Sequence, residues 1–115
     1  MSTGCLFCNI VARSVAAQVI HEDEHVLAFR DIHPVAPSHA LVIPRRHLVG
    51  VHDATPADVA LLGHVLLAAR DVAEGLGLAR SGYRLVVNQG PDGGQSVFHL
   101  HCHVMGGRPM AWPPG

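Results

Sequence analysis

Three histidines stand two residues apart near the end of the chain, in the run FHLHCHVMGG that covers positions 98–107. Side chains alternate between the two faces of a β-strand. In a strand over Val97–Met105, His99, His101 and His103 would therefore project together from an exposed face, while the apolar residues between them would enter the core. Three imidazoles on one face indicate a functional site more strongly than a merely polar surface.

Imidazole chemistry leaves two interpretations of these histidines open. The unperturbed pKa of the side chain lies close to neutrality, so it can bind a metal, transfer a proton or attack an electrophile. In the first interpretation, the three histidines bind a metal ion together. In the second, at least one is a nucleophile or proton donor and the others position an anion. The spacing alone does not decide between them.

A glycine-rich turn, GPDGGQS at 90–96, comes directly before the histidines. Glycine lets successive backbone amides converge on an anion, and the hydroxyl of Ser96 adds a donor. By itself, the run is equally typical of a plain hairpin turn. Next to three histidines it predicts a phosphate site, because imidazoles with converging donors suit attack on phosphorus.

The elements that must position these residues are predicted from apolar periodicity and turn residues. We expect two helices and five strands in one α+β domain with a mostly antiparallel sheet. No internal repeat or linker divides the chain. The expected ranges are Leu6–Arg13 and Thr55–Gly77 for the helices, Val19–His21 and Val26–Arg30 for a hairpin, and His39–Pro44, Gly82–Gly90 and Val97–Met105 for the other strands, with flexible residues at 1–4 and an irregular tail at 108–115.

The long helix predicted over Thr55–Gly77 has a wide apolar surface. Thr55 is placed to cap its start, Pro56 suits the first turn, and Gly75 and Gly77 end it. Apolar residues cover about half of its circumference, whereas a helix that only covers a sheet needs an arc of roughly 100°. The excess predicts a second apolar neighbour, for which a second subunit is a candidate.

Composition and charge exclude several classes of protein. A chain of 115 residues, 49% of them hydrophobic, suits one folded domain. The formal net charge of −1 gives no basic surface for nucleic acid, and no run approaches the roughly 20 apolar residues of a membrane span. The N-terminal sequence does not resemble a signal peptide, and three cysteines do not suggest a disulfide framework. A cytoplasmic location is therefore expected.

Beyond these patterns, the chain resembles a known family. The run HLHCHVM fits the His-x-His-x-His-x-x pattern, with apolar x, of the histidine triad (HIT) superfamily. The runs FRDIHPVAPSHALVIPRRH, VVNQGPDGGQSVFHLHCHVMGG and WPPG are similar to the histidine triad nucleotide-binding proteins. This resemblance covers nearly the whole chain from Cys5. It implies a HIT-like fold whose sheet extends across a homodimer, and hydrolysis of purine nucleoside 5'-phosphoramidates and related adducts of AMP or GMP.

The same resemblance implies roles for the histidines. His101 would be the nucleophile that attacks the α-phosphorus and forms a nucleotidyl-histidine, which water then cleaves. His103 would contact the phosphate and assist the leaving amine. His39 matches a further histidine near the catalytic site, and His99 is the first member of the triad.

A nucleotide pocket is implied as well. Asp31 matches the carboxylate that accepts both ribose hydroxyls, a role that suits a group with two acceptor oxygens. Trp112 belongs to a C-terminal tail that would reach the active site of the partner subunit. The implied phosphate contacts are Asn88, Gly94, Gln95 and Ser96, and the implied apolar walls around the base are Ile32, Phe29, Leu6, Phe7, Ile10 and Leu41.

A Cys-x-x-Cys motif, CLFC, is formed by Cys5 and Cys8 at the start of the short N-terminal helix. A redox motif of this kind usually follows a strand, and no strand is predicted before it. The alternative is half of a zinc site, for which the resemblance to some triad proteins and to galactose-1-phosphate uridylyltransferases implies His47 and His99 as further ligands. Such a Cys2His2 set suits tetrahedral, structural zinc. Free thiols are the remaining alternative.

Three functions remain in competition at this point. The first is a purine nucleoside phosphoramidase of the HIT type. The second is a non-catalytic nucleotide sensor or partner-binding dimer, and the third is a dinucleoside polyphosphate hydrolase. The presence of all three triad histidines together with Asn88 favours the first.

Overall fold

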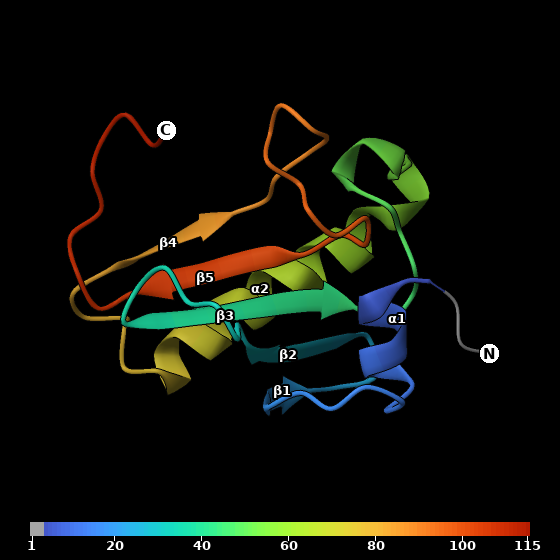
Figure 1. Cartoon of the computed structure of the whole chain (residues 1–115), viewed down its shortest axis with the longest axis horizontal. Helices are drawn as coiled ribbons and strands as arrows, with labels where there is room; N and C mark the ends of the chain where they lie inside the picture. The colour runs from blue at the N-terminus through green and yellow to red at the C-terminus, as the bar shows by residue number, and fades with distance from the viewer. Residues whose placement is uncertain (1–3) are drawn as a thin grey trace.

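The fold is a five-stranded antiparallel sheet with one long and one short helix on opposite faces, seen in a computed structural model that describes residues 4–115 (Figure 1). The predicted α+β class is therefore correct. Apart from Gly4, the flexible terminus expected at 1–4 lies outside the described residues. The strands are β1 (Val19–Glu22), β2 (Val26–Arg30), β3 (Ser38–Pro44), β4 (Tyr83–Val86) and β5 (Cys102–Gly106), in the spatial order β1-β2-β3-β5-β4, and the helices are α1 (Leu6–Val11) and α2 (Val59–Gly75), with 3-10 turns at Val51–Asp53 and Pro56–Asp58.

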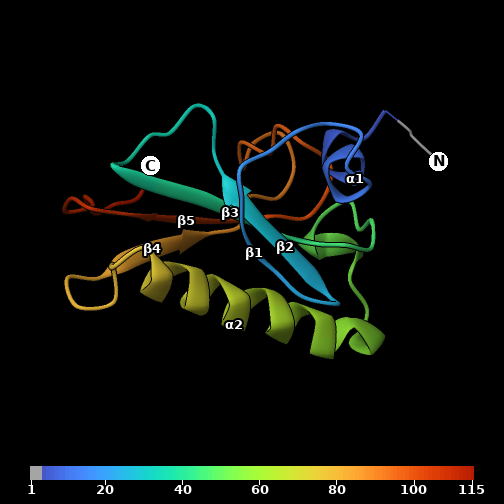
Figure 2. The ribbon, with the colours of Figure 1, turned by 90° about the horizontal axis from the view of Figure 1, so that it is seen from below.

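Helix α2 lies across one face of the sheet and contacts β1, β2, β3 and β5 (Figure 2). Alternate residues of the three central strands pack against it, and the side chains of Val42 and Val104 are fully buried there. The contact is made by the alanine- and valine-rich stripe of the helix, because small side chains let it lie close to the strands. The buried residues of α2 are Val65, Ala68, Ala69, Val72 and Ala73.

The ends of α2 follow the predicted signals. The Thr55 side chain accepts a hydrogen bond from the backbone of Ala57, and the Asp58 carboxylate accepts one from the backbone of Thr55 at 2.9 Å, which forms a capping box. At the other end, Gly77 has φ of +77°, a conformation that favours glycine. The predicted helix is therefore correct in place, although its first turn, Pro56–Asp58, is a 3-10 helix.

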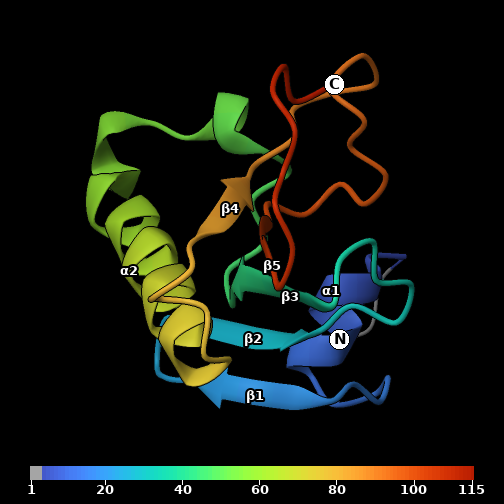
Figure 3. The same ribbon diagram turned by 90° about the vertical axis from the view of Figure 1, so that its left-hand side faces the viewer.

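Helix α1 lies on the opposite face of the sheet, at one end (Figures 2 and 3). Its Phe7 ring meets Phe29 edge-on with the ring centroids 5.4 Å apart. It covers only part of this face, which leaves the rest open toward β5 and β4. The apolar cluster beneath it consists of Phe7, Ile10, Leu27, Phe29, Leu41 and Ile43.

Two strands and one helix are shorter than predicted. β5 begins at Cys102 rather than Val97, because the backbone N–H of Leu100 donates to the carbonyl of Leu48 at 2.6 Å instead of continuing the ladder with β3. β4 covers 83–86 rather than 82–90. α1 ends at Val11, just before Arg13 takes a left-handed φ of +63°.

The tail after Gly106 has no helix or strand, as predicted. Among the described residues, neither helix has the length and apolar character that crossing a lipid bilayer requires.

Candidate active site and metal cluster

A hydrogen bond to the backbone fixes the orientation of the His101 ring. Its Nδ1 lies 2.7 Å from the backbone carbonyl of His99, so the Nδ1–H donates and Nε2 keeps its lone pair. The ring of Phe7 meets it edge-on with the centroids 5.1 Å apart. The expectation of an exposed histidine face is wrong for His99 and His101, which are 0% and 5% exposed, because α1 packs against both rings. His101 is therefore shielded from bulk water, and it lines a cavity.

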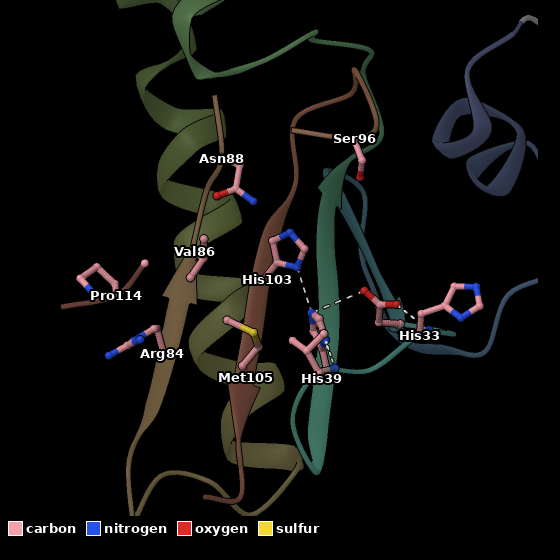
Figure 4. Close-up of a pocket in the computed structure, with 12 residues that line it drawn as sticks. His33, His39, Arg84, Val86, Asn88, Ser96, His103, Met105 and Pro114 are labelled. Carbon is pink, nitrogen blue, oxygen red and sulfur yellow. Dashed lines mark hydrogen bonds and ion pairs between the residues drawn. The ribbon is translucent and has the colours of Figure 1, made fainter. Parts of the chain in front are cut away.

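A chain of hydrogen bonds fixes the third member of the triad. The backbone N–H of Val35 donates to Nδ1 of His39 at 3.1 Å, so the proton of a neutral His39 is on Nε2. That Nε2 lies 2.9 Å from Nδ1 of His103 and 3.5 Å from the carboxylate of Asp31. His103 therefore accepts at Nδ1 and carries its proton on Nε2. In Figure 4 this second ring nitrogen points away from His39, toward the side of the pocket where Asn88 and Ser96 lie.

Burial keeps these imidazoles uncharged. Desolvation, with smaller contributions from the neighbouring His101 and His39, lowers the pKa of His103 to about 4. Desolvation also lowers the pKa of His39, although Asp31 opposes the shift. At neutral pH the pair is thus neutral, and the 3.5 Å contact between His39 and Asp31 is not a salt bridge.

An apolar cavity of about 290 Å³ opens beside His101, between α1 and β2. Seven residues predicted for the base and ribose contribute to it: Leu6, Phe7, Ile10, Phe29, Asp31, Ile32 and Leu41. Ser96, His101 and His103 line the same cavity. One Asp31 oxygen, Oδ1, accepts the backbone N–H of His33 at 2.8 Å, so the carboxylate is held in place with its other oxygen near His39. The structure thus brings the predicted walls, carboxylate and nucleophile together.

A larger cavity of about 700 Å³ adjoins the first one (Figure 4). Asp31, Ser96 and His103 line both cavities, so the two meet at the triad. Asn88 borders only the larger one. A ligand with an apolar ring in the small cavity would therefore place its next groups beside His101 and His103, and a leaving group in the larger space.

Two predicted phosphate-loop residues lie in the loop rather than in the walls of either cavity. The amide of Gln95 accepts the backbone N–H of Gly90 at 2.9 Å and donates to the carbonyls of Val49 and Val97. Gly94 has φ of +83°, a conformation that favours glycine in this turn. Both residues shape the loop that carries Ser96, and direct phosphate contacts from them remain a prediction.

Trp112 also lies outside these two cavities. Its side chain is 82% exposed. The expectation that the tail reaches the active site of a partner subunit therefore remains a prediction.

The sequence-based reasoning missed residues around both cavities. Arg84 and Met105 line the larger one, on the same face of the sheet as His103. Met105 lies two residues after His103, and Arg84 pairs with Met105 across the two strands. The alternation of side chains along a strand could therefore have identified both residues. Residues 15–17 also line the small cavity, but they lie in an irregular segment, where no periodic signal exists.

The two cysteines and two histidines predicted as zinc ligands lie together. Sγ of Cys8 is 3.2 Å from Nδ1 of His47, and Sγ of Cys5 is 3.4 Å from Nδ1 of His99. The two Nδ1 atoms are 3.2 Å apart. A tetrahedral zinc ion with Zn–N near 2.0 Å and Zn–S near 2.3 Å would separate such donors by roughly 3.3–3.8 Å. These spacings therefore fit one metal ion.

Donor chemistry agrees with that fit. His99 donates its Nε2–H to the carbonyl of Pro44 at 2.8 Å, which leaves Nδ1 unprotonated and aimed at the cluster. Burial, with smaller contributions from Cys5, raises the pKa of the Cys8 thiol to about 11. A bound cation would reverse this preference and stabilise the thiolates. Structural zinc thus suits the cluster of Cys5, Cys8, His47 and His99, defined here as the Cys2His2 cluster.

Comparison with known proteins assigns the class of this fold and site. The HIT domain family matches residues 12–110, so the chain belongs to the HIT family. It is 49% identical over 115 residues to an uncharacterized HIT-like protein of Synechocystis sp., with full coverage of both chains. A HIT family hydrolase from Legionella pneumophila has 47% identity and a TM-score of 0.95, over 97% of this chain and 100% of that one.

A zinc-bound histidine triad family protein from Mycobacterium smegmatis is also similar. It has 38% identity and a TM-score of 0.77, over 91% of this chain and 76% of its own. The comparisons therefore show a protein of the HIT family that is similar to hydrolases.

Proposed function

We propose that this protein is a purine nucleotide-binding hydrolase of the histidine triad nucleotide-binding branch. It cleaves the P–N bond of nucleoside 5'-phosphoramidates, and related nucleotidyl adducts, through a nucleotidyl-histidine intermediate. The observation that carries the proposal is the tautomer of His101. Its Nδ1–H is bonded to the carbonyl of His99, which leaves Nε2 of the neutral ring as the nucleophilic atom, and His101 lines the small cavity.

In the proposed complex, the nucleoside occupies the small cavity. The apolar walls contact the purine, and Asp31 accepts the ribose hydroxyls. The phosphate lies where the two cavities meet, with Ser96, Asn88 and the Nε2–H of His103 as donors. The leaving group extends into the larger cavity.

The reaction then has two steps. Nε2 of His101 forms a bond to the α-phosphorus and the P–N bond breaks, while the leaving amine takes up a proton from a water molecule whose oxygen accepts the Nε2–H of the neutral His103. The hydroxide that remains attacks the same phosphorus, and the P–N bond to His101 breaks, which releases the nucleoside monophosphate and restores the neutral imidazole. Covalent catalysis of this kind divides one difficult step into two easier ones, and the fixed donors stabilise charge on the phosphoryl oxygens.

Three further statements belong to the same proposal. Cys5, Cys8, His47 and His99 would hold zinc as a structural cross-link, because the protein would supply all four donors. The protein acts in the cytoplasm, as its few cysteines suggest. It works as a homodimer.

Helix α2 supports the proposed dimer. Val59 is 69% exposed, and Leu66 and Leu67 are each 52% exposed on the side that faces away from the sheet. β4 is an edge strand, so its outer backbone groups are available for pairing with a second copy. Sedimentation should find a dimer at micromolar concentration, and Leu66→Glu should dissociate it. A wild-type monomer under these conditions would contradict this part of the proposal.

Relative turnover of a substrate panel tests the proposed activity. The panel contains adenosine and guanosine phosphoramidates, an acyl-nucleotide and a dinucleoside polyphosphate. We expect the phosphoramidates to have the highest kcat/KM. A preference for the dinucleotide, or nucleotide binding without turnover of any substrate, would favour one of the competing functions instead.

A further inference from the structure

The metal cluster and the nucleotide cavity share helix α1. Cys5 caps the start of this helix and Cys8 lies in its first turn, so both sulfur ligands belong to it. Phe7 and Ile10, on the same helix, form part of the cavity wall. A helix of six residues is too short to be stable by itself. The position of this wall therefore depends on what anchors α1 from outside.

A second connection runs through the backbone of the triad. His99 belongs to the cluster through Nδ1, and its carbonyl accepts the Nδ1–H of His101 at 2.7 Å. Its Nε2–H is tied to Pro44 at 2.8 Å, so the imidazole has no freedom to turn. The ring of Phe7 meets both imidazoles edge-on, with centroids 5.9 Å from His99 and 5.1 Å from His101. One bound ion would thus fix both the cavity wall and the carbonyl that orients the nucleophile.

We infer that the Cys2His2 cluster positions the nucleotide site, with His99 as a positioning residue, so that metal occupancy and nucleotide binding are thermodynamically coupled. This inference rests on the proposed function, because it assumes that a nucleotide occupies the small cavity. The role differs from structural cross-linking alone, since a cluster that only stabilises the fold would not respond to a ligand in the cavity.

Coupling of this kind is reciprocal. If the metal tightens nucleotide binding by some factor, the nucleotide must tighten metal binding by the same factor. Coupling between two sites typically amounts to 5–150-fold. With two direct connections between the sites, we expect a factor of about ten. Saturating AMP should therefore lower the zinc dissociation constant about tenfold, as measured by competition with a chromophoric chelator.

Metal-free protein that unfolds would complicate that measurement, so a second readout uses only folded protein. Co2+ in place of zinc has visible absorption bands that report the geometry of its ligands. The Co2+-loaded protein is titrated with AMP, and calorimetry establishes saturation. We expect the bands to change in proportion to bound AMP.

Two variants in the wall of the same cavity separate coupling from simple occupancy. Phe7→Leu removes the ring that joins α1 to the two imidazoles, and should reduce the change of the Co2+ bands at saturating AMP. Ile32→Ala is the matched control, because Ile32 lines the cavity but lies outside α1 and the cluster. It should weaken AMP binding yet leave the full change at saturation.

The outcomes distinguish a failure of the coupling from a failure of the proposed function. AMP that binds by calorimetry but leaves both the Co2+ bands and the zinc affinity unchanged would overturn the coupling and leave the proposed function intact. Equal loss of the spectral change in Phe7→Leu and Ile32→Ala would also overturn it. Absence of any AMP binding would refute the proposed function and the coupling together.

Discussion

The two faces of the sheet are built by the same strands but bury different kinds of side chain. On the face that α2 covers, the cluster around Val42 and Val104 consists of apolar residues. On the α1 face, a smaller apolar cluster around Phe7 continues into imidazoles that are bonded to the backbone and to one another. Adjacent residues of one strand divide between the two: Val104 faces α2 and His103 faces the cavities.

This contrast shows how a domain of 115 residues separates stability from chemistry. Buried polar groups are costly unless they have partners. Each buried imidazole therefore has a hydrogen bond that orients the ring: His99 and His101 are bonded to backbone carbonyls through one nitrogen, and His39 is bonded through both. The α2 face buries apolar side chains that need no hydrogen-bond partners, so its packing contributes to stability alone. Substitutions on the two faces should accordingly have different kinds of effect.

The largest expected effect is on the α1 face, at the nucleophile. His101→Ala removes the covalent route, and hydrolysis of a phosphoramidate should fall by about 10⁴-fold or more. AMP should still bind, because Asp31, Asn88 and Ser96 remain. Single-turnover kinetics and calorimetry measure the two properties separately. Near-normal turnover by this variant would contradict the assignment.

A smaller loss is expected for the neighbouring histidine. His103→Ala removes a hydrogen-bond donor and proton-transfer group, a change that typically costs about 10²–10⁴-fold. A residual rate should remain measurable in the same assay. His33→Ala is a suitable control, since this exposed histidine also borders both cavities but lies outside the triad. An equal loss in both variants would show that His103 has no special role.

The metal cluster should matter for stability as well as for activity. Cys8→Ser removes one ligand, and zinc content should fall below one ion per chain by elemental analysis. The free energy of unfolding should fall by several kcal/mol, a fraction of the roughly 10–16 kcal/mol with which zinc is held in small zinc domains. Cys102→Ala is the matched control, because this third cysteine is buried on the α2 face. Unchanged zinc content in Cys8→Ser would contradict the proposed site.

On the α2 face, the effect should be limited to stability. Val104→Ala removes two methyl groups from a fully buried position and should lower the free energy of unfolding by about 2 kcal/mol. Denaturant titration measures this loss. The kcat of the folded fraction should stay at the wild-type value. A large fall in kcat with normal stability would show that the two faces are not independent.

The smallest and most gradual effect is expected from acid. His103 has a pKa of about 4 in the folded protein, against an ordinary value of 6.5. Between these values the unfolded chain binds the proton and the folded chain does not, so the free energy of unfolding falls as the pH drops from 6.5 toward 4. Above pH 6.5 this contribution is constant. His103→Gln should show a flatter decline in the same titrations, and an unchanged slope would contradict the shift.

Much of this arrangement was predictable from local patterns. Alternation placed His103 and Val104 on opposite faces, and the Thr55 cap located the start of the long helix. The Cys-x-x-Cys motif and the triad indicated the metal cluster only together with the resemblance to a family, because its ligands come from three distant segments of the chain.

Other features depend on contacts that no local pattern encodes. β5 starts late because Leu100 bonds to Leu48, which is distant in the sequence. His101 is buried because Phe7 of α1 covers it. The roles of its two nitrogens follow from a backbone carbonyl whose orientation becomes visible only in the folded chain.

Mapping the covalent intermediate tests the central claim most directly. A phosphoramidate labelled in the nucleotide is mixed with the protein and quenched within the first turnover, and the labelled peptide is identified by mass spectrometry. The account predicts a nucleotidyl group on His101, and retention of configuration at phosphorus after two displacements. A nucleotidyl group on His99 or His103, or no adduct together with inversion at phosphorus, would contradict it.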